Sequence, residues 1–177
     1  MRSRKLAISA ISASIIAIVL TLGAYVEVAD VFCVILSSAF VILPIYYKTY
    51  VGCFLTYLAG GVLAFMFSGF NVFSIVFPSY FAFFGVFPIV KCIMADKNFN
   101  KWFGIIIGAI WCIASAYGLY FYYTAVMGLN FINLPEWIAN NILYFVGVLG
   151  VVFYVLFDRF VYFLRIAIDR YLGRIVK

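Results

Sequence analysis

Aromatic hydroxyls, carboxamides and one carboxylate gather in a single stretch of an otherwise apolar chain, residues 117–144. Phenol and carboxamide groups form hydrogen bonds, and aromatic rings stack on flat ligands. Aromatic walls with a few carboxamides are what a small polar ring ligand requires. This stretch is therefore the candidate small-molecule site of the sequence, although it does not identify the ligand.

The polar residues at the end of the stretch repeat with helical spacing. Trp137, Asn140, Asn141 and Tyr144 occupy positions i, i+3, i+4 and i+7, which share one face of a helix. That face descends about 10 Å from the surface at the usual rise per residue. Carboxamides facing lipid are costly, so we expect both asparagines to face the bundle or a wet cavity.

Other residues of the stretch also have structural explanations. Asn133 lies three residues before Glu136, which fits a helix N-cap with its capping-box acid. Tyr120, Tyr122, Tyr123 and Trp137 suit the aromatic belt at a membrane surface equally well. Capping and belt roles therefore stay open beside the binding role.

The composition indicates a membrane protein. Of the 177 residues, 68% are hydrophobic and only 10% are charged, and the mean hydropathy is +1.20. A soluble fold of this size could not bury so much apolar surface, whereas a bilayer accommodates it. The apolar runs are long and do not alternate, which favours helices over a barrel.

The residue types argue against an enzyme and against a metal or cofactor site. The chain has no histidine, and its six acids are scattered rather than clustered. Imidazole bases and the commonest metal ligand are thus missing. The cysteines fall singly in separate apolar segments, as packing residues do: Cys33, Cys53, Cys92 and Cys112.

The apolar segments predict an all-α integral membrane protein with six transmembrane helices in one membrane domain, residues 1–177. Each segment is long enough to cross the hydrocarbon core or nearly so. We read the first as a retained helix rather than a signal peptide. The expected spans are 6–26, 29–47, 51–67, 72–93, 102–127 and 137–157, followed by an amphipathic helical tail at 158–177.

The charges predict the orientation. Six spans place the N-terminus and the C-terminus on one side, and all twelve Lys and Arg then fall on that side. The other side then holds only three charged residues, Glu27, Asp30 and Glu136. This is a positive-inside split, so both termini are expected to be cytoplasmic. The net charge of +6 thus reflects orientation, and no nucleic-acid motif accompanies it.

Two further patterns concern helix packing. Ser9, Ala13 and Ala17 form a stripe of small residues on the first helix, which suits either a partner protein or packing within the bundle. The pairs Phe77-Pro78 and Phe87-Pro88 predict a kinked or broken fourth helix.

Six spans in 20.0 kDa, with both ends inside and Ala13-Ser-Ile-Ile-Ala17 on the first helix, resemble the substrate-binding S components of energy-coupling factor (ECF) vitamin transporters. That stretch looks like the Ala-x-x-x-Ala coupling motif of the family. Segments 84–91 and 157–172 also look like those of small uncharacterised Gram-positive membrane proteins of S-component-like organisation.

The resemblance implies a protein in the plasma membrane of a bacterium that captures a vitamin-like nutrient from outside. Ser9, Ala13 and Ala17 would dock onto a transmembrane coupling subunit that carries ATPase subunits, so this chain itself would hydrolyse no ATP. The first loop, with Glu27 and Asp30, would be a gate. The implied substrate-binding residues are Asn71, Tyr117, Tyr120, Asn133, Trp137, Asn140, Asn141 and Tyr144.

A structural scaffold subunit with the same six-helix plan is the alternative. In a scaffold, the small-residue stripe and the basic tail would be partner surfaces, and residues 117–144 would serve only as aromatic belt and packing.

Overall fold

The computed structural model describes residues 2–47, 49–97, 99–127 and 141–175, which are helical almost throughout and contain no strand. The chain forms two compact units. One comprises Met1–Phe99 with Phe160–Lys177, and the other comprises Asn100–Arg159. Each unit is described below by itself.

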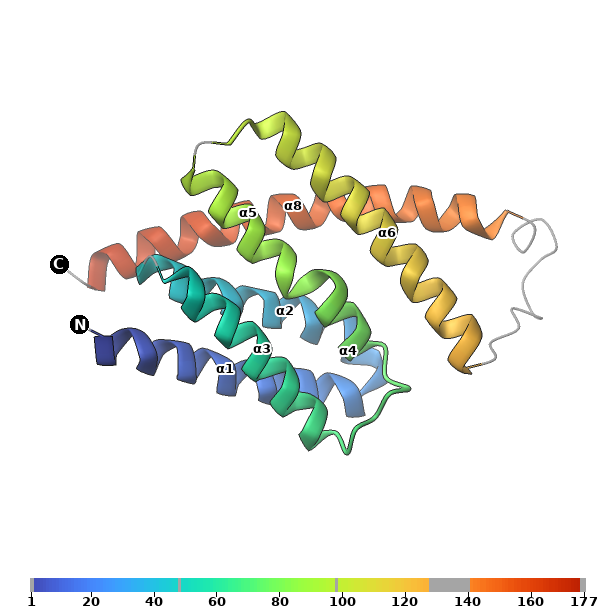
Figure 1. Ribbon diagram of the computed structural model, residues 1–177, viewed down its shortest axis with the longest axis horizontal. Coiled ribbons are helices and arrows are strands. Elements are labelled where there is room, and N and C mark those ends of the chain that lie inside the picture. The colour runs from blue at the N-terminus through green and yellow to red at the C-terminus, as the bar shows by residue number, and fades with distance from the viewer. Residues whose placement is uncertain (1, 48, 98, 128–140, 176–177) are drawn as a thin grey trace. The chain divides into compact units, whose positions relative to one another are not determined.

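The helices of the first unit follow one another closely along the chain (Figure 1). They are α1 (Arg2–Tyr25), the 3-10 turn η1 (Glu27–Ala29), α2 (Asp30–Ile42), the 3-10 turn η2 (Leu43–Tyr47), α3 (Tyr50–Phe67), α4 (Val76–Ser79), the π-helical segment η3 (Tyr80–Phe84) and α5 (Val86–Asp96). The second unit contains α6 (Lys101–Met127) and the first part of α8 (Ile142–Ile175).

Five helical segments of the described chain are long and apolar enough to cross a membrane: Ser3–Tyr25, Tyr50–Phe67, Val76–Asp96, Trp102–Ala125 and Ile142–Ile168. They are the helices of a membrane protein, as the composition predicts. The expected second span, 29–47, is instead divided between α2 and η2. With 13 residues, α2 is about 20 Å long, shorter than a hydrocarbon core of about 30 Å. The count of six spans stays a prediction.

Small residues bring α1 and α3 close together. A Cβ added at Gly60 would lie 2.7 Å from the Ile16 side chain and 3.2 Å from the Ala13 carbonyl oxygen. One turn earlier in α3, the Thr56 hydroxyl donates to the Ser9 carbonyl of α1 at 3.1 Å, which also joins the two helices. Helices approach this closely only where small residues face one another.

The predicted irregularity between the two Phe-Pro pairs is a π-helical segment, η3. The Gly85 amide donates to the Tyr80 carbonyl at 2.9 Å, one residue earlier than in an α-helix. The Phe81 carbonyl accepts instead from the Tyr57 hydroxyl of α3, at 3.1 Å. Pro88 lacks the amide donor that would bond the Phe84 carbonyl four residues back, so α-helical pairing is also interrupted at the end of η3.

In the first unit, the contacts at the helix ends agree with the prediction that successive membrane spans run in opposite directions. At the start of α1, the Arg4 guanidinium lies 6.0 Å from the centre of the Tyr47 ring in η2. At the other end, the Tyr25 hydroxyl donates to the Phe67 carbonyl at the end of α3, at 3.4 Å. Segments assigned to one side of the membrane therefore meet, while the cytoplasmic side itself stays a prediction.

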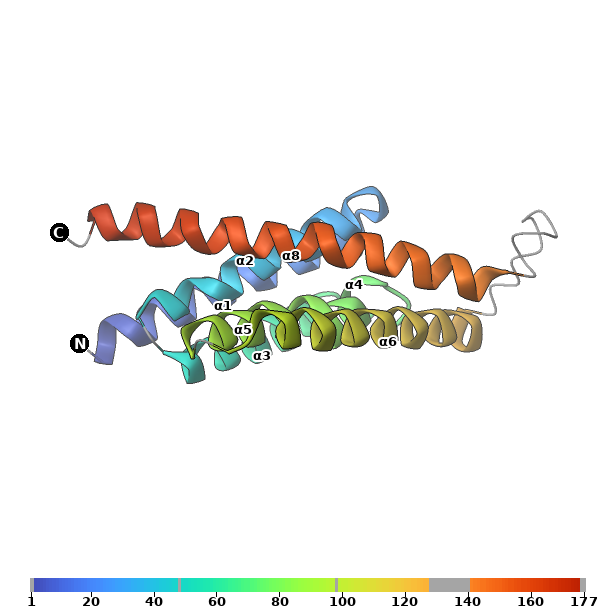
Figure 2. The same cartoon turned by 90° about the horizontal axis from the view of Figure 1, so that it is seen from above.

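Helix α8 is continuous over 34 residues (Figure 2). The sequence predicts a sixth span that ends at 157 and an amphipathic helical tail from 158. The described parts of both lie in this one helix, which continues without a break to Ile175, and the point where the chain leaves the membrane stays a prediction. Its last part, from Phe160, belongs to the first unit.

Candidate functional site

In the second unit, the end of α6 meets the start of α8. The Tyr117 hydroxyl donates to the Leu143 carbonyl at 3.1 Å. A Cβ added at Gly147 would lie 3.0 Å from the same hydroxyl oxygen, so this glycine leaves room for the tyrosine. Five residues earlier in α6, the Cys112 thiol lies 3.5 Å from the Gly150 carbonyl. The two helices are therefore antiparallel, with Tyr117 of α6 beside the first turns of α8.

Asn141 lies directly before α8 and contributes to the first turn of that helix. Its carbonyl accepts hydrogen bonds from the amides of Tyr144 at 3.0 Å and Phe145 at 3.2 Å. Its side chain is exposed. Asn133, Trp137 and Asn140 lie outside the described residues, so the predicted polar face over 137–144 stays a prediction.

The two remaining tyrosines of the predicted set do not converge with Tyr117. Tyr144 is 77% exposed, so its ring is directed away from protein packing. Tyr120 is half-buried and packs edge-to-face on Phe121, with ring centres 5.6 Å apart. Of the described candidates, the structure brings together only Tyr117 and the Asn141 end of α8.

The predicted residues of the first unit have local structural roles. Asn71 accepts a hydrogen bond from the Phe73 amide through Oδ1 at 3.1 Å, which is an Asx turn. Glu27 begins η1 and Asp30 begins α2, where an acid in the first turn suits the helix dipole. These contacts neither require nor test a gating role.

The small-residue stripe of α1 lies inside the first unit. Ala13 is 6% and Ala17 is 2% exposed, and the Ser9 carbonyl accepts from Thr56 of α3. Packing within the bundle, the alternative left open by the sequence, accounts for this arrangement. Docking of a partner through these residues would require a surface that α3 already covers.

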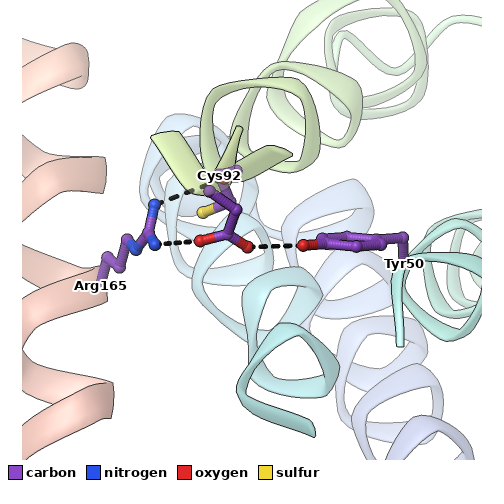
Figure 3. Close-up of polar contacts among 4 residues, drawn as sticks. Tyr50, Cys92 and Arg165 are labelled. Atoms are coloured by element: carbon purple, nitrogen blue, oxygen red, sulfur yellow. Dashed lines mark hydrogen bonds and ion pairs between the residues drawn. The ribbon is translucent and has the colours of Figure 1, made fainter. Parts of the chain in front are cut away.

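Sequence reasoning missed a polar cluster that joins three segments of the first unit (Figure 3). Arg165 of α8 forms an ion pair with Asp96 at the end of α5 and donates to the Cys92 carbonyl at 3.3 Å. The Tyr50 hydroxyl, at the start of α3, donates to the other Asp96 oxygen at 2.8 Å. The distribution of charges predicts that all three segments lie on one side of the membrane, but it does not predict that they touch one another.

A double-mutant cycle tests this cluster. Because both charged side chains are about a quarter exposed, at 28% and 25%, we expect a coupling free energy of about 1 kcal/mol between Asp96→Asn and Arg165→Gln. Unfolding of the purified protein by denaturant in mild detergent would measure it. Lys97→Gln, which neutralises an exposed neighbour of Asp96, should show no coupling to Arg165→Gln; equal coupling would contradict the contact.

Comparisons with protein-family models, with curated proteins and with solved structures found no match. The family suggested by the sequence therefore stays a prediction, and the function must be argued from the residues themselves.

Proposed function

We propose that the chain is the membrane-embedded substrate-binding subunit of an ECF-type uptake system, which captures a small, flat, polar nutrient from outside a bacterial cell. One observation supports this most directly. The hydrogen bond from Tyr117 to Leu143 holds one aromatic ring of α6 beside the start of α8, two residues after the Asn141 carboxamide. These are the groups that hold a vitamin-like ring through stacking and hydrogen bonds.

The charge pattern supports an outward position for this end. The other end of α6 begins at Lys101, next to the basic segment assigned to the cytoplasm. A helix of 27 residues is about 40 Å long, enough to carry Tyr117 and the residues after it towards the outer surface. In this proposal, coupling and ATPase subunits supply the energy. The buried stripe of α1 gives no support to docking through that helix.

A structural scaffold is the second candidate, because aromatic rings fill the first unit where the ends of α3 and α4 meet. Phe65 packs edge-to-face on Phe70 and on Phe77, with ring centres 5.3 and 5.2 Å apart. Close ring packing serves rigidity and provides no polar group for a ligand. A scaffold would not require a ligand at the connected end of α6 and α8.

Native mass spectrometry of protein purified in mild detergent from cells grown in rich medium tests the proposal. We expect a bound small molecule, with occupancy lowered about tenfold in Asn141→Ala through loss of a hydrogen-bonding carboxamide. Asn100→Ala removes the same group at the opposite end of α6 and should leave occupancy unchanged. Absence of any ligand, or equal loss in both variants, would favour the scaffold.

A further inference from the structure

The last part of α8 carries two faces of different character. One face is engaged within the first unit: Val161 is buried, and Arg165, four residues later, is bound to Asp96 and to the Cys92 carbonyl. The other face is exposed although it is rich in large apolar side chains. Tyr162 is 55%, Phe163 is 66% and Ile166 is 39% exposed.

Two arginines border this exposed apolar patch on the same face. Arg159, Tyr162, Phe163, Ile166 and Arg170 occupy positions i, i+3, i+4, i+7 and i+11, which form one stripe along a helix. Both arginines are exposed, in contrast to Arg165 on the engaged face. We refer to these five residues as the α8 stripe.

The length of α8 places the stripe at a membrane surface. For a helix that starts at the outer edge of the hydrocarbon core at Ile142 and runs close to the membrane normal, the core of about 30 Å ends near Tyr162. Ile166 then lies about 6 Å further, in the headgroup layer. Arg159 lies on the hydrocarbon side of the headgroup layer, and Arg170 lies on its aqueous side. The long, flexible side chains of both arginines therefore reach the layer.

We propose that the α8 stripe binds anionic phospholipid headgroups of the cytoplasmic leaflet. Tyr162 and Phe163 are aromatic residues at the interface, where such rings anchor helices. The guanidinium groups of Arg159 and Arg170 pair with phosphate through charge-assisted hydrogen bonds. A basic, ring-bearing face at this depth complements a negatively charged lipid surface, and it favours anionic over zwitterionic lipid.

The test uses the full-length protein in vesicles that contain equal amounts of dioleoyl phosphatidylcholine and dioleoyl phosphatidylglycerol. After gentle detergent extraction, mass spectrometry of the retained lipid gives the ratio of phosphatidylglycerol to phosphatidylcholine. We expect this ratio to exceed that of the vesicle. Each of Arg159→Gln and Arg170→Gln should lower it about fivefold, which corresponds to the attraction of one basic residue to an anionic surface.

Two controls keep the outcome decisive. Arg4→Gln combined with Lys97→Gln removes two positive charges, twice the change of either stripe variant, from exposed positions outside the stripe and should leave the ratio within about twofold of the parent. Arg159→Lys combined with Arg170→Lys keeps the charge and should keep most of the enrichment, even if the glutamine variants fold poorly. Equal retention of both lipids by the parent, or an equal loss in the Arg4 and Lys97 variant, would overturn the proposal.

Discussion

Gly85→Ala should strongly destabilise the protein, with a loss of about 3 kcal/mol in the free energy of unfolding. A Cβ at this position would lie 2.3 Å from the Tyr57 ring. The ring cannot swing aside cheaply, because its hydroxyl donates to the Phe81 carbonyl and the ring packs against Tyr80, with ring centres 5.4 Å apart. Denaturant titration in mild detergent would measure the loss.

Gly118→Ala is the matched control for Gly85→Ala. A Cβ at Gly118 in α6 would meet nothing within 4 Å, so we expect no loss and a small gain from helix propensity. Combining Gly85→Ala with Tyr57→Leu removes the clashing ring and should show a favourable coupling between the two substitutions. Equal stability of Gly85→Ala and Gly118→Ala would contradict the contact between η3 and α3.

Gly60→Leu should separate α1 from α3 and lower the free energy of unfolding by about 3 kcal/mol or more. The added side chain would collide with Ile16, whose Cβ lies 2.9 Å from the position of the new Cβ, and with the Ala13 backbone. A β-branched side chain and a helix backbone cannot adjust as a flexible chain end does. The same titration would measure this effect.

Gly118→Leu introduces the same side chain at an open position and should change the stability by less than about 0.5 kcal/mol. A second pair of variants tests the same contact with a smaller side chain. Ile16→Ala makes space on α1, so the double variant Ile16→Ala with Gly60→Ala should recover part of the free energy of unfolding that Gly60→Ala alone loses. A stable Gly60→Leu protein would show that α1 and α3 do not approach through these residues.

Much of the helical plan could be predicted from hydropathy and flanking charges. The expected spans 6–26, 51–67 and 102–127 lie close to the bounds of α1, α3 and α6, because long uncharged runs end at charged or turn-forming residues. The expected second span differs more. Its apolar run includes Pro44, and the chain changes there from α-helix to the 3-10 turn η2. Hydropathy cannot distinguish these two backbone forms.

Charge could indicate where the apolar run of the sixth span ends, at Asp158 and Arg159, and the pattern after it predicts a helical tail. It could not show that span and tail form one unbroken helix, because that depends on continuous backbone pairing through both residues. The Phe-Pro pairs predicted an irregular helix. They could not predict η3 itself, since its displaced carbonyl accepts from Tyr57, a residue on another helix.

The candidate site was only partly predictable. The position of Tyr117 beside the start of α8 follows from the antiparallel pairing of two helices that one connection joins. The sequence analysis missed the role of Gly147 and Gly150, two small residues of α8 at which an added Cβ would lie 3.0 Å from the Tyr117 hydroxyl and 3.8 Å from the Ala116 Cβ of α6. The contact of Arg165 with Asp96 joins positions 69 residues apart, a pairing that no local pattern encodes.

That separation has a consequence for biogenesis. α1 and α3 can associate as soon as α3 has been synthesised, because their contact needs only residues of the first two-fifths of the chain. Asp96, in contrast, can meet the Arg165 guanidinium only after 69 more residues have been added. At typical translation rates, their synthesis takes on the order of 4–14 s. The first unit is therefore completed late, and a ribosome stalled before Arg165 would leave Asp96 with its Tyr50 partner on α3 but without its cationic partner on α8.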